Sequence, residues 1–291
     1  MNDPLRKYPS KIMLVGEYGV VVGGSALTIP FHHFYAAVRR MDDIPPGKEA
    51  EAARSARYLA DLYTYIRELP EGSFHAKPDH SLFSRDLDRY WLDMNIPIGY
   101  GLGSSGAVSA AVYDLFFPAA RMLDLPRQRA DLATIESFFH GRSSGVDALT
   151  CHAMTSLHFP EDGTIQRVDL DPSALPGEYR LFLLDSGEKF DTGPLVKKFL
   201  ANMEDQRFAR SIREDYLLIN RKLIESLLGL READPAMLVR LVSDYQLNHM
   251  REMIPERMID AWIEGLVTNE YYFKLNGSGG GFMLGCCYGR H

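Results

Sequence analysis

Apolar and polar residues follow two kinds of pattern along the chain, and these patterns predict its strands and helices. Short runs of β-branched and aromatic residues between turn residues predict strands, at 11–15, 20–22, 26–30, 34–40, 90–98, 156–159, 166–170, 179–184, 271–275 and 282–287. Apolar residues that recur every three or four positions predict helices, at 49–68, 107–117, 126–139 and 258–266, with two or three more between 194 and 250. The elements come in mixed order, and no segment repeats.

The turn-rich stretch near residue 165 separates two halves of different character. The first half holds a glycine-rich segment before a buried helix, and the second holds a long helical stretch between strands. A chain of 291 residues is about twice a typical domain. We therefore expect two α+β domains, residues 1–165 and 166–291, with a cleft between them.

Composition and charge narrow the class of protein. With 46% hydrophobic and 24% charged residues, the chain resembles an average globular protein. This excludes a disordered tail, a collagen-like repeat and a disulfide-stapled miniprotein. The 32 basic and 39 acidic side chains give a net charge of −7, and no run of Lys and Arg offsets it. Because such a surface repels phosphate backbones, nucleic acid is not an expected partner.

The cysteines and the apolar runs indicate the cellular compartment in which the protein is expected. Cys151, Cys286 and Cys287 are odd in number and lack the spacing of zinc ligands, which predicts reduced thiols in a reducing compartment. The first residues lack the apolar core of a signal peptide, and no run approaches the roughly 18 apolar residues of a membrane span. We expect a cytoplasmic protein that does not enter a membrane.

The segment Pro97–Gly106, with the sequence PIGYGLGSSG, is the most informative in the chain. Its glycines allow backbone amides to face one anion, and the helix that follows adds its positive end. Ser104 and Ser105 add hydroxyls for phosphate or magnesium. The alternative is an ordinary capped turn into a helix, but four glycines in eight residues exceed what a cap requires.

Two other phosphate-binding loops are less compatible with the sequence. The pattern G-x-x-x-x-G-K-[ST] is absent from the chain. Residues 101–106 match G-x-G-x-x-G, but a dinucleotide site also needs an acidic residue at the end of a second strand about 20 residues on. Residues 107–140 look helical throughout. The NAD interpretation is therefore disfavoured.

Charged residues near two further glycine clusters complete a set for phosphoryl transfer. Glu136 lies near the end of a predicted helix, and Asp147 follows a glycine-rich turn inside an apolar run. A carboxylate there needs a partner, although a helix cap is the competing interpretation. Lys274 precedes a cluster with four glycines in residues 276–281, more than a hairpin needs. With Lys11 these are the parts of metal-assisted phosphoryl transfer.

Three segments resemble the motifs of the GHMP small-molecule kinases. Residues 97–106 are similar to the central P-x-x-x-G-L-G-S-S motif, and residues 11–30 and 276–281 resemble the first and third motifs. Within that family, Glu136 with the segment 140–147 (HGRSSGVD) is similar to the mevalonate kinase pattern E…H-G-x-P-S-G-[IV]-D. The resemblance implies a two-domain α+β fold with the active site in the cleft between the domains. It also implies a short bacterial-type mevalonate kinase.

The resemblance further implies ATP and Mg²⁺ as cofactors and a role for each matching position. Asp147 would accept the proton of the mevalonate hydroxyl, beside Lys11. Mg²⁺ would be held by Ser105 and Glu136. The substrate or the nucleotide side would be lined by Glu17, Tyr18 and Thr192. The ATP phosphates would be bound by Gly99, Tyr100, Gly101, Leu102, Gly103, Ser104, Ser105, Gly277, Ser278 and Gly279.

Several departures from the pattern keep the acceptor open. Tyr18 stands where many mevalonate kinases have a substrate-contacting histidine, and Ser143 replaces the usual proline. Gly106 stands for a common alanine, and Asn276 and Ser278 for Thr and Ala. The alternatives are a related kinase acting on phosphomevalonate, with Arg142 as a candidate phosphate contact, or on a sugar. A sensor that binds ATP without catalysis is the third. A homodimer also stays open.

Overall fold

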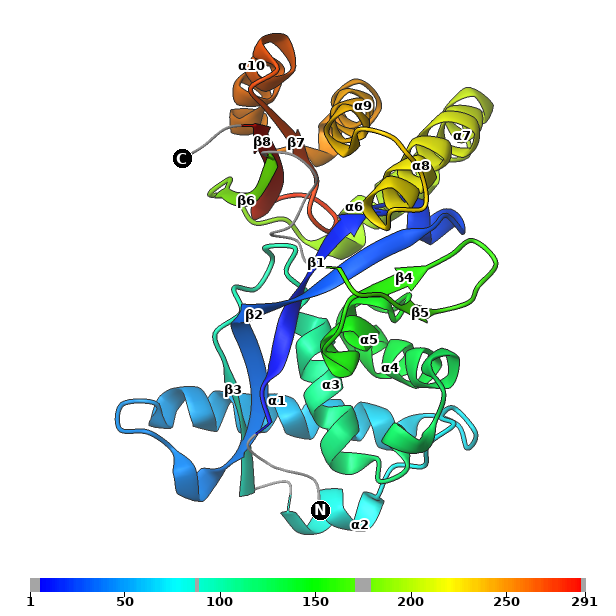
Figure 1. Cartoon of the computed structure of the whole chain (residues 1–291). Coiled ribbons are helices and arrows are strands. Elements are labelled where there is room, and N and C mark those ends of the chain that lie inside the picture. Colours follow the sequence, from blue (N-terminus) through cyan, green and yellow to red (C-terminus); the bar gives the residue numbers. More distant parts are fainter. Residues whose placement is uncertain (1–5, 87–88, 171–178, 289–291) are drawn as a thin grey trace. The chain divides into compact units, whose positions relative to one another are not determined.

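A computed structural model describes residues 6–86, 89–170 and 179–288 of the chain (Figure 1). By their contacts the residues divide into two compact units, neither of which is continuous in sequence. Unit 1 takes the chain up to Lys11, then Pro30–Pro97 and Gly103–Thr155; unit 2 takes Ile12–Ile29, Ile98–Leu102 and the chain from Ser156 onward. The expected α+β class is confirmed. The boundary near residue 165 and the cleft between two domains stay predictions.

Unit 1 is mainly helical, with α1 (Glu49–Glu68), α2 (His80–Asp86), α3 (Ser104–Phe116), α4 (Leu125–His140) and α5 (Val146–Ala153). It also holds the first half of strand β1 (Tyr8–Val15). The second half of β2 (Ala26–Arg40) pairs antiparallel with β3 (Tyr90–Met94), and α1 packs on β3 (Figure 1). Helix α3 is almost wholly buried and contacts both α4 and α5. It is the central element of this unit.

Unit 2 is built around an antiparallel sheet in the order β6–β8–β7, with β6 (Tyr179–Asp185), β7 (Tyr271–Lys274) and β8 (Phe282–Tyr288). The first half of β2 pairs with β4 (Leu157–Phe159), which pairs with β5 (Gln166–Arg167). Its helices are α6 (Thr192–Asn202), α7 (Gln206–Ser211), α8 (Leu217–Leu227), α9 (Pro235–His249) and α10 (Ile259–Thr268). Helices α9 and α10 pack on β7.

Asp-Pro and Asp-Leu-Pro sequences begin two of the long helices. The Asp234 carboxylate accepts the Ala236 amide at the start of α9 at 2.9 Å, and Asp124 accepts the Arg127 amide at the start of α4 at 3.0 Å. In each helix a proline occupies the first turn, where its missing N–H costs nothing. Gly141 ends α4 with φ +73°, a conformation that glycine adopts readily. These signals fix the ends of α4 and the start of α9.

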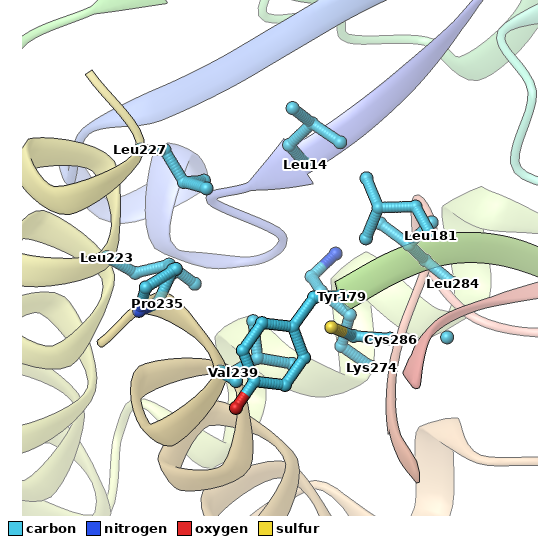
Figure 2. Close-up of a pocket in the computed structure, with 12 residues that line it drawn as sticks. Leu14, Tyr179, Leu181, Leu223, Leu227, Pro235, Val239, Lys274, Leu284 and Cys286 are labelled. Carbon is cyan, nitrogen blue, oxygen red and sulfur yellow. The ribbon is translucent and has the colours of Figure 1, made fainter. Parts of the chain in front are cut away.

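An apolar pocket lies within unit 2, between the sheet, α8, α9 and β1 (Figure 2). Aliphatic side chains predominate in its lining, which consists of Leu14, Tyr179, Leu181, Leu223, Leu227, Pro235, Ala236, Val239, Lys274, Leu284, Gly285 and Cys286. Burial raises the pKa of the Cys286 thiol to about 12, so this thiol stays protonated. None of the residues predicted for the site lines this pocket.

Most predicted elements are present, but helices α2 and α5 were not predicted, and some predicted strands were wrong in detail. Residues 19–22 form a 3₁₀-helix instead of a strand, because Tyr18 and Gly23 both take positive φ and close a tight turn. The strands expected at 26–30 and 34–40 are one strand, β2. Pro30 lies between the part paired with β4 and the part paired with β3, so its missing N–H removes no bond to either.

The stretch 194–250 contains three helices, as predicted: α6, α9 and a continuous helix over 206–227, in which a π-helical turn at Ile212–Tyr216 joins α7 to α8. The first break lies between α6 and α7, where the Asp205 carboxylate accepts the amides of Arg207 and Phe208 at 2.8 and 2.9 Å. No helix among the described residues is long and apolar enough to cross a membrane. Cys151, Cys286 and Cys287 are free cysteines in the structure.

Candidate active site

A lysine and an aspartate, 136 positions apart in sequence, form an ion pair within unit 1. The Lys11 ammonium on β1 lies 3.0 Å from Oδ2 of Asp147, in the first turn of α5. The Lys11 side chain is 1% exposed and that of Asp147 is 30% exposed. Apart from this ion pair, Lys11 Nζ has no hydrogen-bond partner among the described residues. The pair therefore presents an accessible carboxylate above a buried cation.

Two glycines let α3 and α5 begin beside this ion pair. Gly103 precedes α3 with φ +71°, and a Cβ on it would lie 2.8 Å from Cγ of Lys11. A Cβ on Gly106 would lie 2.9 Å from the backbone nitrogen of Ala148. Any larger residue would push the helices apart or displace the lysine. The free amides at the start of α3 therefore lie near Lys11.

A second carboxylate of unit 1 is held by hydroxyl groups. Ser105 donates to Oε1 of Glu136 at 2.9 Å, and Ser143 donates to Oε2. Nε2 of His140 lies 3.1 Å from the Ser105 hydroxyl. Burial of Glu136, only 4% exposed, raises the pKa of its carboxyl, and the nearby charge of Asp147 raises it further. This carboxyl would hold its charge more readily beside a cation.

The chemistry of this donor set fits Mg²⁺. Carboxylate and hydroxyl oxygens are hard ligands, and Mg²⁺ takes one or two carboxylates and fills its shell with phosphate oxygens and water. Among the described residues no group of three or more His, Cys, Asp and Glu side chains could hold a metal by itself. Ser105 and Glu136 would thus suit a magnesium ion that arrives with a nucleotide.

In unit 2, three of the predicted residues form a chain of contacts. The Tyr18 hydroxyl donates to the backbone oxygen of Ser278 at 2.5 Å, and the Ser278 hydroxyl donates to that of Thr192 at 3.1 Å. The Tyr18 ring packs on Phe199 with centroids 4.8 Å apart. Tyr18 has φ +60°, which is strained for a bulky residue. These contacts keep it in that conformation and only 4% exposed.

The Glu17 carboxylate, predicted to line the substrate site, is buried in unit 2. It pairs with the Lys274 ammonium, which also donates to the backbone oxygens of Met13 at 3.1 Å and Leu275 at 2.7 Å. The Tyr216 hydroxyl donates to the backbone oxygen of Glu17 at 3.0 Å. The buried ion pair of Glu17 thus connects the first motif to the strand that leads into the third motif. Its predicted contact with substrate stays a prediction.

The first part of the central glycine loop packs on the third motif within unit 2. A Cβ on Gly101 would lie 2.1 Å from the backbone oxygen of Asn276, and one on Gly281 would lie 2.1 Å from Cα of Tyr100. The Phe282 amide donates to the backbone oxygen of Tyr100 at 3.3 Å. Both glycines have positive φ. Glycine is required here because two backbones touch, whatever ligand they bind.

The predicted site residues thus fall into two groups. Unit 1 holds Lys11, Gly103, Ser104, Ser105, Glu136 and Asp147, and unit 2 holds Glu17, Tyr18, Gly99, Tyr100, Gly101, Leu102, Thr192, Gly277, Ser278 and Gly279. Contacts within unit 1 join Lys11 to Asp147 and Ser105 to Glu136. That both groups serve one site stays a prediction.

Sequence reasoning gave no role to two residues of the Glu136 cluster. Nε2 of His140 contacts the Ser105 hydroxyl. Ser143, noted only as a substitution for proline, donates to Glu136. Both lie in the quoted segment 140–147, but nothing in the residue pattern indicates which carboxylate a hydroxyl faces.

The comparisons with known proteins bear on this geometry. Residues 71–153 match the family model of the GHMP kinases N terminal domain. Over these residues the chain is similar to the N-terminal domain of the GHMP kinases. This stretch includes the central glycine loop, Glu136 and Asp147, so the resemblance noted in the sequence is confirmed. No curated protein sequence matches the chain.

Solved structures of GHMP kinases share the fold over nearly the whole chain. L. major mevalonate kinase, in complex with R-mevalonate, superposes with a TM-score of 0.62 at 17% identity, covering 99% of this chain and 90% of that one. Streptococcus pneumoniae phosphomevalonate kinase, with phosphomevalonate and AMPPNP, gives 0.62 at 16%, covering 98% and 92%. Lactococcus lactis galactokinase, with galactose, gives 0.63 at 11%, covering 97% and 84%. These likenesses establish the fold.

Proposed function

We propose that this GHMP-kinase-like chain transfers the γ-phosphoryl group of ATP to the primary hydroxyl of mevalonate, giving 5-phosphomevalonate and ADP. The observation that carries the proposal is the Lys11–Asp147 pair at the start of α3 and α5. A sensor that only binds ATP needs no accessible carboxylate above a buried ammonium. A kinase needs one to take the proton of the acceptor hydroxyl.

The mechanism assigns each charge to one task. Asp147 accepts the hydroxyl proton as the oxygen attacks phosphorus. The Lys11 ammonium, which has hydrogen atoms to spare, donates to the acceptor oxygen and offsets its developing negative charge. Positioning and electrostatics of this kind supply most of the catalysis in phosphoryl transfer.

The phosphates would be bound by backbone amides and by a metal ion. The amides of Gly99–Ser105 and of the third motif, Gly277–Gly279, would donate to phosphate oxygens, and the positive N-terminal end of α3 would attract the same charge. Ser105 and Glu136 would hold Mg²⁺, which when bound offsets the charge of the β- and γ-phosphates. Tyr18 and Thr192 would border the acceptor, together with Glu17.

The motif HGRSSGVD at residues 140–147 and the fold shared with mevalonate kinases support mevalonate as acceptor. One observation favours a second candidate. Tyr18 stands at the position of a substrate-contacting histidine, but its hydroxyl donates to the backbone oxygen of Ser278. The same proton cannot be donated to the phosphoryl-accepting substrate. Arg142 is exposed on the loop before α5 and could bind a phosphorylated acceptor such as phosphomevalonate.

A coupled assay of ADP release tests the proposal. The full chain is incubated with ATP and Mg²⁺ and with mevalonate, phosphomevalonate or galactose in turn. We expect mevalonate to give the highest kcat/KM. Highest activity on phosphomevalonate would replace the acceptor but keep the reaction. ATP binding without turnover on any of the three would overturn the kinase proposal in favour of a sensor.

A further inference from the structure

Ser143 occupies a position in the loop between α4 and α5 where the mevalonate kinase pattern has proline. Its hydroxyl donates to Oε2 of Glu136 and accepts the backbone amide of Gly145 at 2.9 Å. The side chain is half-buried. A proline at this position could make neither contact, because it has no hydroxyl. The interaction is therefore a property of this chain.

With Ser143 in place, both oxygens of Glu136 are held. Ser105, at the start of α3, binds Oε1 at 2.9 Å, and Ser143 binds Oε2. Two hydroxyl donors from different elements prevent the carboxylate from rotating about its last bond. A long side chain held this way loses its rotamer freedom before any ligand arrives, which lowers the cost of binding one.

The same serine reaches the helix that carries the predicted base. Gly145 precedes α5 with φ +71°, and a Cβ on it would lie 2.4 Å from the backbone oxygen of Arg129 on α4. Asp147 follows two residues later. The Ser143 hydroxyl thus joins Glu136, on α4, to Gly145, the residue that caps the start of α5, through two hydrogen bonds.

We propose that Ser143 is a positioning residue, which orients Glu136 for a divalent cation and couples this carboxylate to the helix of Asp147. The inference rests on the proposed function, because it assigns the cation to Glu136 and Ser105. Partners of this kind, which bind a metal ligand without binding the metal, typically contribute 10- to 100-fold to metal affinity.

Binding of Mn²⁺, used as a paramagnetic substitute for Mg²⁺, tests the role without reliance on activity. Free Mn²⁺ is measured by electron paramagnetic resonance in titrations of the full chain with ADP present. We expect Ser143→Ala and Ser143→Pro to raise the Mn²⁺ dissociation constant about 10-fold or more. Ser143→Thr, which keeps the hydroxyl, should restore affinity to within about 3-fold of the original chain.

Ser144→Ala provides the matched control. The Ser144 hydroxyl accepts the Val146 amide at 3.4 Å on the same loop and has no hydrogen bond to Glu136 among the described contacts, so Mn²⁺ affinity should not change. Unchanged affinity in Ser143→Ala, even with a lower melting temperature, would reduce Ser143 to a structural residue and overturn the inference alone. If the unaltered chain with ADP binds no Mn²⁺, the inference falls together with the proposed function.

Discussion

At the scale of single residues, the exposure of Asp147 differs from that of its partner. The carboxylate reaches solvent while the Lys11 ammonium below it is buried. Burying an ammonium is costly unless it is paired, so Lys11 depends on Asp147 when no substrate is present. Removing the charge of Asp147 therefore affects both the proposed proton transfer and the free energy of burying the Lys11 ammonium.

Asp147→Asn should lower kcat by about 100-fold or more, because an amide cannot accept the hydroxyl proton and general-base assistance is typically worth 10²–10⁴-fold. The dissociation constant of ATP should change little, since no phosphate contact is assigned to Asp147. Steady-state kinetics and a nucleotide-binding titration measure the two effects. Asp61→Asn, on the exposed face of α1, is the control. Turnover within 3-fold of the original would contradict the base assignment.

Residue patterns indicate that Asp147 needs a partner, but only the resemblance indicates that this partner is Lys11. Lys11 before an apolar strand is typical of a solvated strand end, and Asp147 before a helix is typical of a cap. The structure places Asp147 inside the first turn, with Gly145 at the cap position. Their contact joins β1 to α5, and a contact over 136 positions leaves no periodicity in the sequence.

At the scale of elements, the contact between α3 and α5 is closer than a side chain allows. A Cβ on Gly106 would lie 2.9 Å from the Ala148 nitrogen and 3.0 Å from the Asp147 carbonyl carbon. Distances of this size cannot be absorbed by a flexible side chain, because the neighbour is backbone. The position where many relatives have alanine therefore sets the spacing of two helices here.

Gly106→Ala should move α5 and with it Asp147. We expect a loss of about 1–3 kcal/mol in the free energy of unfolding, the usual cost of overpacking, and a lower kcat. Denaturant unfolding and kinetics measure both. Gly193→Ala in α6 is the control, since a Cβ there meets no atom within 4 Å. Equal stability of Gly106→Ala and the original chain would show that α5 shifts freely.

A buried acidic residue on α3 ties this helix to its neighbours. Asp114 is bonded by Arg121 and lies 3.7 Å from Nε2 of His152 on α5. Burial alone would raise the pKa of the Asp114 carboxyl, but the interactions with His152, Arg121 and Tyr8 outweigh it and hold the pKa well below its usual value of 3.8. The ionised form is the one that stabilises unit 1.

The pH dependence of an Asp114→Asn variant follows from this direction. Because the folded-state pKa is lower, ionised Asp114 contributes stability above the unfolded-state pKa near 3.8, and this is lost as the pH falls through the folded-state value. At pH 7 we expect the variant to lose about 3 kcal/mol, and less below pH 4. Unfolding curves at several pH values measure it.

Asp42→Asn controls for the loss of a surface charge. Asp42 is 85% exposed and lies 3.9 Å from Arg40, so its contribution should be below about 1 kcal/mol at any pH. If Asp114→Asn had the same small, pH-independent effect on stability, the contacts of Asp114 with Arg121 and His152 would not stabilise unit 1.

Local patterns predicted some elements well and missed others, among them helices α2 and α5. The periodicity of Ala and Leu gave residues 49–68, the bounds that α1 has. The run Val20–Val22 has the β-branched residues of a strand, but the positive φ of Tyr18 turns the chain before it. Local propensity cannot include that turn, because Phe199 and Ser278, which hold Tyr18, lie about 180 and 260 positions away.

At the scale of the whole molecule, the order of the sequence and the compact units do not coincide. The predicted division at residue 165 treats each half as continuous. Unit 2 also needs Ile12–Ile29 and Ile98–Leu102, and Glu17 supplies the carboxylate that neutralises buried Lys274. A C-terminal half made alone would bury that ammonium without its partner.

A fragment of residues 166–291 should therefore not fold cooperatively. We expect it to lack a sharp thermal transition and to bind a hydrophobic dye, whereas the full chain melts cooperatively. Calorimetry and dye fluorescence distinguish these outcomes. Adding a Lys274→Met change to the fragment removes the unpaired charge and separates its effect from that of the missing strands. A cooperative transition in the unaltered fragment would support 166–291 as an independent domain.

Because the chain passes back and forth between the two units, they are completed at different times during synthesis. Every residue of unit 1 has left the ribosome once Thr155 emerges, whereas residues 12–29 must wait for the last strand, β8, before unit 2 is complete. Over that interval an apolar N-terminal strand is available to the wrong partners. Newly made chains should therefore depend on chaperones, and premature stop codons near the 3′ end of the message should abolish accumulation even though the Lys11–Asp147 pair is encoded intact.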